Sequence, residues 1–155
     1  MTYEQWTIGI APKVIGHWNF HNLLPSGLDF FVSMSSISAM IGVPGHANYA
    51  AANTYEDAFA FWRKSMGEEA ISLNLSAVFG VGVMEYSGVE KSAWYDMISL
   101  NETEMNCLLG FAMKKTTLKG IPCPTQLTTG VNPAMLNVPS MHWYVILSSF
   151  SCALC

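Results

Sequence analysis

Tyr49 and Asn53 are the two residues of this sequence whose types and spacing best suit acid–base chemistry. They stand one helical turn apart and would share a helix face, and the alanines at positions 50–52 would let another group approach that face closely. A tyrosine can protonate an alkoxide as it forms, but its ordinary pKa of about 10 is too high for efficient work at neutral pH. A nearby lysine cation would favour the phenolate and lower that pKa.

Ser36 and Lys13 could complete such a site. A serine hydroxyl can donate to the carbonyl oxygen of a substrate and hold it beside the tyrosine. The Asn53 amide can fix a water molecule or a backbone group in the proton path. Each residue also has a common structural role, as a packed tyrosine, a turn serine, a capping or surface asparagine, or a solvated lysine. Spacing alone leaves both interpretations open.

The elements that would hold these residues alternate between helix and strand. Segment 12–24 begins with a proline, which suits the first turn of a helix. Segments 28–36 and 70–79 are short apolar runs, as in strands inside a parallel sheet. This alternation predicts an α/β fold with a parallel sheet. Ligands of such sheets bind beyond the carboxyl ends of the strands, where Ser36 and the loop at 80–82 would lie.

The segment from about residue 47 to residue 66 has the clearest helix pattern, with Gly67 as its C-terminal stop. Its predicted apolar face, at 3–4 spacing, consists of Ala51, Tyr55, Ala58, Phe59, Trp62 and Met66. The charged side chains expected largely elsewhere are Glu56, Asp57, Arg63 and Lys64. Further on, residues 101–115 could form a short helix, residues 120–140 are rich in turn formers, and the apolar ending 141–155 has no obvious place.

Composition argues against several classes of function. The chain has 155 residues, 51% of them hydrophobic and 12% charged, with a net charge of −4, which fits one domain or part of one. No basic cluster occurs, so neither nucleic acid nor a membrane surface is expected as a partner. The sequence has no signal peptide pattern and no apolar run of about 20 residues, so a cytoplasmic location is expected. No metal site is predicted, because zinc-ligand spacing is not completed around Cys107, Cys123, Cys152 and Cys155.

The stretch FFVSMSSISAMIGVPGHANYAAANTYEDAFAFWR, residues 30–63, resembles the active-site half of the ketoreductase domain of polyketide synthases. The fungal, highly reducing type is the nearest match, and these domains belong to the short-chain dehydrogenase/reductase superfamily. The likeness includes APKVIGHWNFHNLL and LNLSAVFGVGVM, and PCPTQLTTGV resembles the segment after the catalytic core. It implies the carboxyl-terminal part of a Rossmann-like ketoreductase domain at residues 1–90. A post-ketoreductase segment and a divergent, irregular tail would follow at residues 91–155.

The resemblance implies a catalytic tetrad of Lys13, Ser36, Tyr49 and Asn53. In the family the tyrosine donates the proton, the serine orients the carbonyl, and the lysine tunes the tyrosine and touches the cofactor ribose. Asn53 stands where ordinary superfamily members have their lysine, which here would come from upstream, as in synthase ketoreductases. The implied cofactor is NADPH, and the residues implied to contact it are Lys13, Tyr49, Val81 and Gly82. The implied substrate is a β-ketoacyl chain carried on an acyl carrier protein.

One part of the family pattern is missing from this sequence. No G-x-G-x-x-G occurs, although this turn would place the cofactor pyrophosphate at a helix N-terminus. The chain is therefore expected to be a fragment that is inactive alone and whose first strand is an exposed sheet edge. Two alternatives stay open. One is a non-catalytic truncated remnant or small subunit that packs on another synthase chain. The other is a general oxidoreductase of free small molecules, which Asn53 in place of the lysine disfavours.

Overall fold

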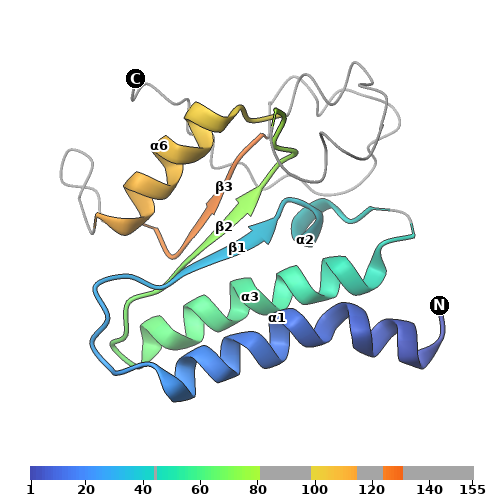
Figure 1. The fold of residues 1–155 in the computed structure, drawn as a ribbon, viewed down its shortest axis with the longest axis horizontal. Helices are drawn as coiled ribbons and strands as arrows, with labels where there is room; N and C mark the ends of the chain where they lie inside the picture. Colours follow the sequence, from blue (N-terminus) through green and yellow to red (C-terminus); the bar gives the residue numbers. More distant parts are fainter. Residues whose placement is uncertain (44, 81–98, 115–123, 131–155) are drawn as a thin grey trace.

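A three-stranded parallel sheet lies between layers of helices (Figure 1). The computed structural model describes residues 1–43, 45–80, 99–114 and 124–130. The strands follow the order β1-β2-β3 and are β1 (Val32–Ser36), β2 (Ile71–Leu75) and β3 (Gln126–Thr128). Val32 lies opposite Ile71, and Ser72 lies opposite Gln126. The predicted α/β fold with a parallel sheet is confirmed.

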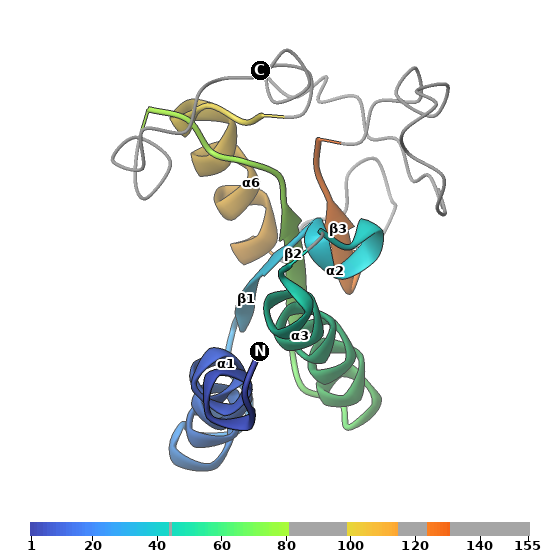
Figure 2. The ribbon, with the colours of Figure 1, turned by 90° about the vertical axis from the view of Figure 1, so that its right-hand side faces the viewer.

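Helices cover both faces of the sheet. α1 (Tyr3–Leu23) and α3 (Ala47–Ser65) lie side by side on one face, and α6 (Glu102–Met113) lies on the other (Figure 2). α3 connects β1 to the parallel strand β2, and the one-turn helix α2 (Ser38–Ile41) follows the carboxyl end of β1. Because helices pack on both sides, the central strand β2 is buried on both faces.

The apolar core is correspondingly divided in two. The cluster on the side of α3 consists of Phe31, Phe59, Ala60 and Ala70, with Leu28 and Tyr55 packed against it. The cluster on the side of α6 consists of Ile71, Leu73, Ala112 and Leu127, with Val32, Leu75, Leu108, Leu109 and Phe111 around it. The two apolar segments of the sequence thus supply both clusters, as expected for strands covered on both faces.

The first helix begins nine residues earlier than the sequence pattern predicted. Thr2 and Gln5 form a capping box, in which the Thr2 hydroxyl accepts from the Gln5 backbone and the Gln5 side chain accepts from the Thr2 backbone. This pair satisfies two backbone donors at the helix start, so α1 begins at Tyr3. Pro12 therefore lies inside the helix, where it has no N–H to bond the carbonyl of Ile8.

The bounds of α3 match the prediction, but its buried face does so only in part, at Phe59 and Tyr55. Gly67 follows the helix with a φ of 80°, a left-handed conformation that glycine adopts readily. The residues of α3 that are buried are Ala52, Asn53, Glu56, Asp57, Phe59, Ala60 and Arg63. Ala58, Trp62 and Met66 are exposed. The apolar pattern failed here because the charged side chains find partners on α1 and on the sheet, which makes their burial tolerable.

The later part of the described chain is consistent with the same layers. α6 lies within the predicted helix at residues 101–115 and begins with a capping box between Asn101 and Glu104. β3 falls in the segment at residues 120–140 that is rich in turn formers, and three residues are too few for a strand pattern to be visible. The domain boundary predicted at residue 90 lies outside the described residues. None of the described helices is long and apolar enough to cross a membrane.

Candidate active site

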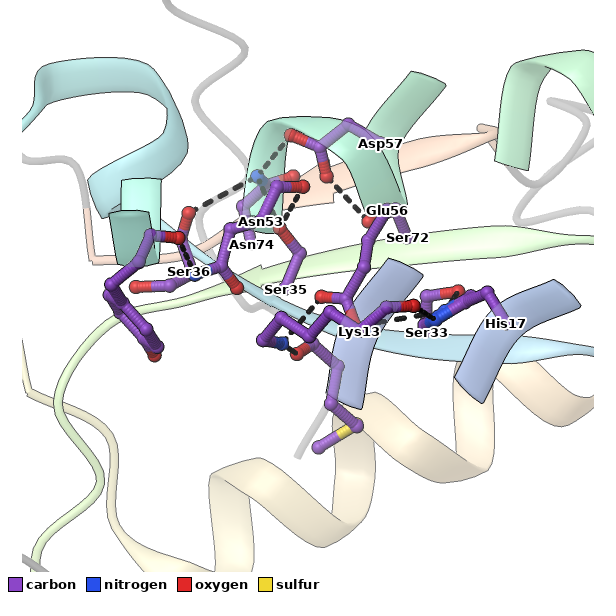
Figure 3. Close-up of polar contacts among 12 residues, drawn as sticks. Lys13, His17, Ser33, Ser35, Ser36, Asn53, Glu56, Asp57, Ser72 and Asn74 are labelled. Carbon is purple, nitrogen blue, oxygen red and sulfur yellow. Dashed lines mark hydrogen bonds and ion pairs between the residues drawn. The ribbon is translucent and has the colours of Figure 1, made fainter. Parts of the chain in front are cut away.

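The end of β1 and the first turns of α3 form one hydrogen-bonded network (Figure 3). Ser36 is the last residue of β1, and its hydroxyl accepts from the backbone N–H of Ser38 at 3.2 Å. Asn74, on the neighbouring strand β2, donates to the Ser36 carbonyl at 3.3 Å and to the Ser35 hydroxyl at 3.2 Å. These bonds fix the carboxyl end of β1 against β2 and present Ser36 there.

Asn53 joins this network to Tyr49. The Asn53 amide nitrogen donates to the Tyr49 carbonyl at 2.7 Å, and the Ser35 hydroxyl donates to the Asn53 carbonyl at 3.1 Å. Asn53 is fully buried, and its side-chain oxygen has no partner among the described residues. Tyr49 itself is 46% exposed. The network therefore anchors the backbone of Tyr49 while its phenol stays accessible.

Lys13 reaches the same two elements from α1. Its ammonium donates to the Met34 carbonyl on β1 at 2.9 Å and to the Glu56 carboxylate on α3 at 2.6 Å. Met34 precedes Ser36 by two residues, and Glu56 follows Asn53 by one helical turn. The side chain of Lys13 thus bridges α1, β1 and α3 (Figure 3).

Most of the residues expected at the site lie on three adjacent elements. Lys13, Ser36, Tyr49 and Asn53 belong to α1, the end of β1 and the start of α3. Tyr49 and Asn53 are in direct contact. No hydrogen bond between described residues joins Lys13 to Tyr49 or Ser36. Val81 and Gly82, implied as cofactor contacts, lie outside the described residues. The catalytic roles of these residues stay predictions.

Two groups beside Lys13, the buried Glu56 and the partly buried His17, were not predicted as part of the site. His17, one turn after Lys13, places Nδ1 2.7 Å from the Lys13 carbonyl and Nε2 2.8 Å from the Ser33 hydroxyl. Because a carbonyl oxygen only accepts, Nδ1 carries the hydrogen, and Nε2 of the neutral ring accepts from Ser33. Glu56 Oε1 lies 3.6 Å from His17 Nε2. Spacing was an available signal, since Asn53 and Glu56 are three residues apart and share a helix face.

Burial opposes the charged form of both Glu56 and His17. It raises the pKa of Glu56, and the hydrogen bond and charge of Lys13 oppose that rise. It lowers the pKa of His17, while the hydrogen bond to the Lys13 carbonyl opposes that change. The Lys13 ammonium, 2.6 Å from the Glu56 carboxyl group, is the cation that favours its charged form.

Asp57 fixes the part of the network that lies on strands β2 and β3. Its carboxylate accepts from Ser72 at 2.6 Å, from Asn74 at 2.8 Å and from Gln126 at 3.1 Å. It thereby fixes the same Asn74 amide that contacts Ser35 and Ser36. A buried carboxylate with three donors is well satisfied, and its place between α3, β2 and β3 gives it a structural role.

Comparison with known proteins finds a KR domain model, polyketide synthases and solved ketoreductases. A family model described as the KR domain matches residues 1–80. A highly reducing polyketide synthase of Gibberella zeae, ZEA2, is 37% identical over 138 residues, which are 86% of this chain and 6% of that protein. A reducing polyketide synthase of Alternaria solani, pksF, is 52% identical over 82 residues, which are 53% of this chain and 4% of that protein. The chain thus spans a small part of the curated relatives that it matches.

Solved structures show the same fold. A ketoreductase from the first module of phoslactomycin biosynthesis in Streptomyces sp. HK803 has a TM-score of 0.63 and 30% identity, and the match covers 76% of this chain and 28% of that one. An N-terminal ketoreductase from the macrolactin assembly line has a TM-score of 0.61 and 27% identity, over 84% of this chain and 24% of that one. The three-layer arrangement described above is therefore similar to part of those domains.

Proposed function

This chain belongs to the KR domain family, and from that premise we propose that it carries the active-site side of a ketoreductase. The reaction is the reduction of a β-ketoacyl thioester to the β-hydroxyacyl form in polyketide biosynthesis, with the acyl chain on an acyl carrier protein. The observation that supports it best is the bonded network that fixes Tyr49 and Asn53 against the serines at the end of β1.

Each residue of the network has a role in this proposal. Ser36 donates its hydroxyl hydrogen to the substrate carbonyl oxygen, and Tyr49 gives that oxygen its proton as the carbonyl carbon is reduced. The Lys13 ammonium favours the phenolate that remains on Tyr49. The buried, unpartnered oxygen of Asn53 is an acceptor that can hold a water molecule in the path that returns a proton to Tyr49.

NADPH is the proposed cofactor, and when bound it supplies the hydride. Lys13 fits a cofactor contact, because an ammonium has three donors and its described bonds use two, so one remains for a ribose hydroxyl. Tyr49, exposed at the carboxyl end of the sheet, fits as well. The glycine-rich turn that would bind the cofactor phosphates is missing, since the sequence contains no G-x-G-x-x-G. We therefore include in the proposal a nucleotide-binding segment that brings this turn to the edge of β1 that has no partner among the described strands.

A fluorescence titration with NADPH tests the proposal. The 155-residue chain is titrated alone and mixed with a separately expressed nucleotide-binding half of a related ketoreductase. Saturable binding is expected in the mixture, weakened roughly 10-fold in Lys13→Ala by loss of a charged contact. Tyr49→Phe should bind NADPH but lose reduction of a β-ketoacyl thioester, because the proton donor is gone. Lys64→Ala, which removes a lysine from the other end of α3, is the matched control.

The second candidate is a non-catalytic remnant or a small subunit that packs on another synthase chain. The edge position of β1 among the described strands and the absence of any buried residue on α1 favour it, because both leave a surface open. Absence of NADPH binding in both arms, by a chain that gives a cooperative unfolding transition, would contradict the ketoreductase proposal and favour this candidate.

A further inference from the structure

The ammonium of Lys13 is held at two points that differ in kind. The Met34 carbonyl is part of the β1 backbone and is fixed by the sheet. The Glu56 carboxylate is a side chain on α3, and its bond of 2.6 Å is the shorter of the two. A lysine side chain has four rotatable bonds and presents a point charge. With the backbone acceptor alone, the ammonium could adopt several positions. Two acceptors on different elements restrict it to one position.

The surroundings of Glu56 favour its contact with Lys13. It is buried, so its carboxylate needs a counter-charge close by. Its other oxygen faces the Nε2 atom of His17 at 3.6 Å, and that ring is oriented by bonds to the Lys13 carbonyl and the Ser33 hydroxyl. Because Nε2 of this neutral ring carries no hydrogen, it gives Glu56 no hydrogen bond, and the Lys13 ammonium is the donor that holds the carboxylate among side chains of α1, β1 and α3.

We propose that Glu56 is a positioning residue for the reduction, because its carboxylate fixes the Lys13 ammonium where it can act on Tyr49. Glu56 acts through Lys13 and touches neither substrate nor cofactor. It lies one helical turn from Asn53, so α3 carries both a member of the implied tetrad and the group that places another member. This inference rests on the proposed function, since it assigns Glu56 an effect on the role of Lys13.

The contact itself is tested without any cofactor. In ¹H–¹⁵N spectra of the lysine ammonium groups, Lys13→Arg identifies the Lys13 signal by its loss. Glu56→Gln should shift or broaden that signal, because exchange with water accelerates once the ion pair is gone. Glu69→Gln is the matched control, since Glu69 pairs with Lys64, and it should leave the Lys13 signal in place. A Lys13 signal that is the same in Glu56→Gln and wild type would overturn the proposal.

The effect on chemistry is tested in the reconstituted reductase described above. Glu56→Gln should lower kcat roughly 10- to 100-fold, as expected for a reacting group displaced by about 1 Å. It should have little further effect in a Lys13→Ala background, because a residue that acts through Lys13 is non-additive with it. Glu56→Asp, which keeps the charge on a shorter arm, should recover part of the rate and keeps the test valid if Glu56→Gln folds poorly.

The outcomes separate the two proposals. A shifted Lys13 signal with an unchanged kcat would overturn the positioning role while leaving the ketoreductase proposal intact. Fully additive losses of rate in the double variant would do the same, because they would show that Glu56 acts independently of Lys13. Wild-type chain that gives no reduction in the mixture would contradict the ketoreductase proposal itself, and with it the use of the contact in catalysis.

Discussion

His17 lies beside the contact between Lys13 and Glu56, and its protonation would place a second cation next to that carboxylate. Burial lowers its pKa below the ordinary 6.5, so the unfolded chain binds this proton more readily than the native chain. Its contribution to stability is therefore complete above about pH 6.5 and is lost as the pH falls through the lowered value. His17→Gln cannot be protonated, and its unfolding free energy should fall less than that of wild type between about pH 7.5 and 5.5. Urea unfolding at both pH values measures this difference.

His46→Gln is the control for His17→Gln. His46 is exposed, and its side chain makes no capping hydrogen bond at the start of α3. Equal losses of stability in wild type and His17→Gln would contradict the prediction. The raised pKa of Glu56 acts in the opposite direction, since a carboxyl group that binds its proton more tightly when folded gains stability on acidification. Comparison of the two histidine variants with wild type isolates the contribution of His17 to the change in unfolding free energy with pH.

At the scale of single residues, the resemblance suggested the proposed tetrad but not the carboxylate that contacts Lys13. Tyr49 and Asn53 are visible because their spacing is fixed within one helix. Glu56 was expected away from the buried face, because a charged side chain is rarely buried without a partner. Its partner comes from α1, 43 residues earlier in the chain. A contact between two helices depends on how they pack, which local spacing does not encode.

At the scale of elements, the start of α1 offers a direct test of the corrected helix boundary. The Thr2 hydroxyl accepts from the Gln5 backbone at 3.2 Å, and loss of such a cap costs about 1 kcal/mol. Thr2→Ala should therefore destabilise the chain by about 1 kcal/mol in urea unfolding, whereas Thr2→Ser should leave its stability nearly unchanged. An unchanged stability in Thr2→Ala would indicate a helix that begins further along, as the position of Pro12 had suggested.

The elements differ in how much of them could be predicted. The bounds of α3 followed from a long periodic segment with Gly67 behind it, because both signals are local. The start of α1 was misjudged because Pro12 is also tolerated inside this helix, although it removes one backbone bond. β3 has three residues, and it exists as a strand because β2 offers it partners. A pairing of this kind depends on the assembled sheet rather than on the segment itself.

At the scale of the whole molecule, alternation of helix and strand was enough to predict the α/β fold, because parallel strands require crossover connections. What alternation does not predict is the surface left open beside β1. Ile8, Ile15 and Leu23 on α1 are 65%, 56% and 82% exposed. They are seven and eight residues apart and so form one stripe along the helix. α1 contacts β1 through Lys13, and β1 pairs only with β2 among the described strands.

An open apolar stripe on α1, together with a strand edge that has no partner among the described strands, should make the chain self-associate. The weight-average mass from sedimentation equilibrium is expected to rise with protein concentration. Ile15→Lys with Leu23→Lys should reduce that rise, because charged side chains oppose burial of the stripe. Phe61→Lys, at an exposed apolar position on α3, is the control for an added charge elsewhere.

If a nucleotide-binding half covers this edge of β1, as proposed above, its addition should suppress self-association of wild type. Self-association that persists in that mixture would show that the added half does not cover the stripe and the edge of β1.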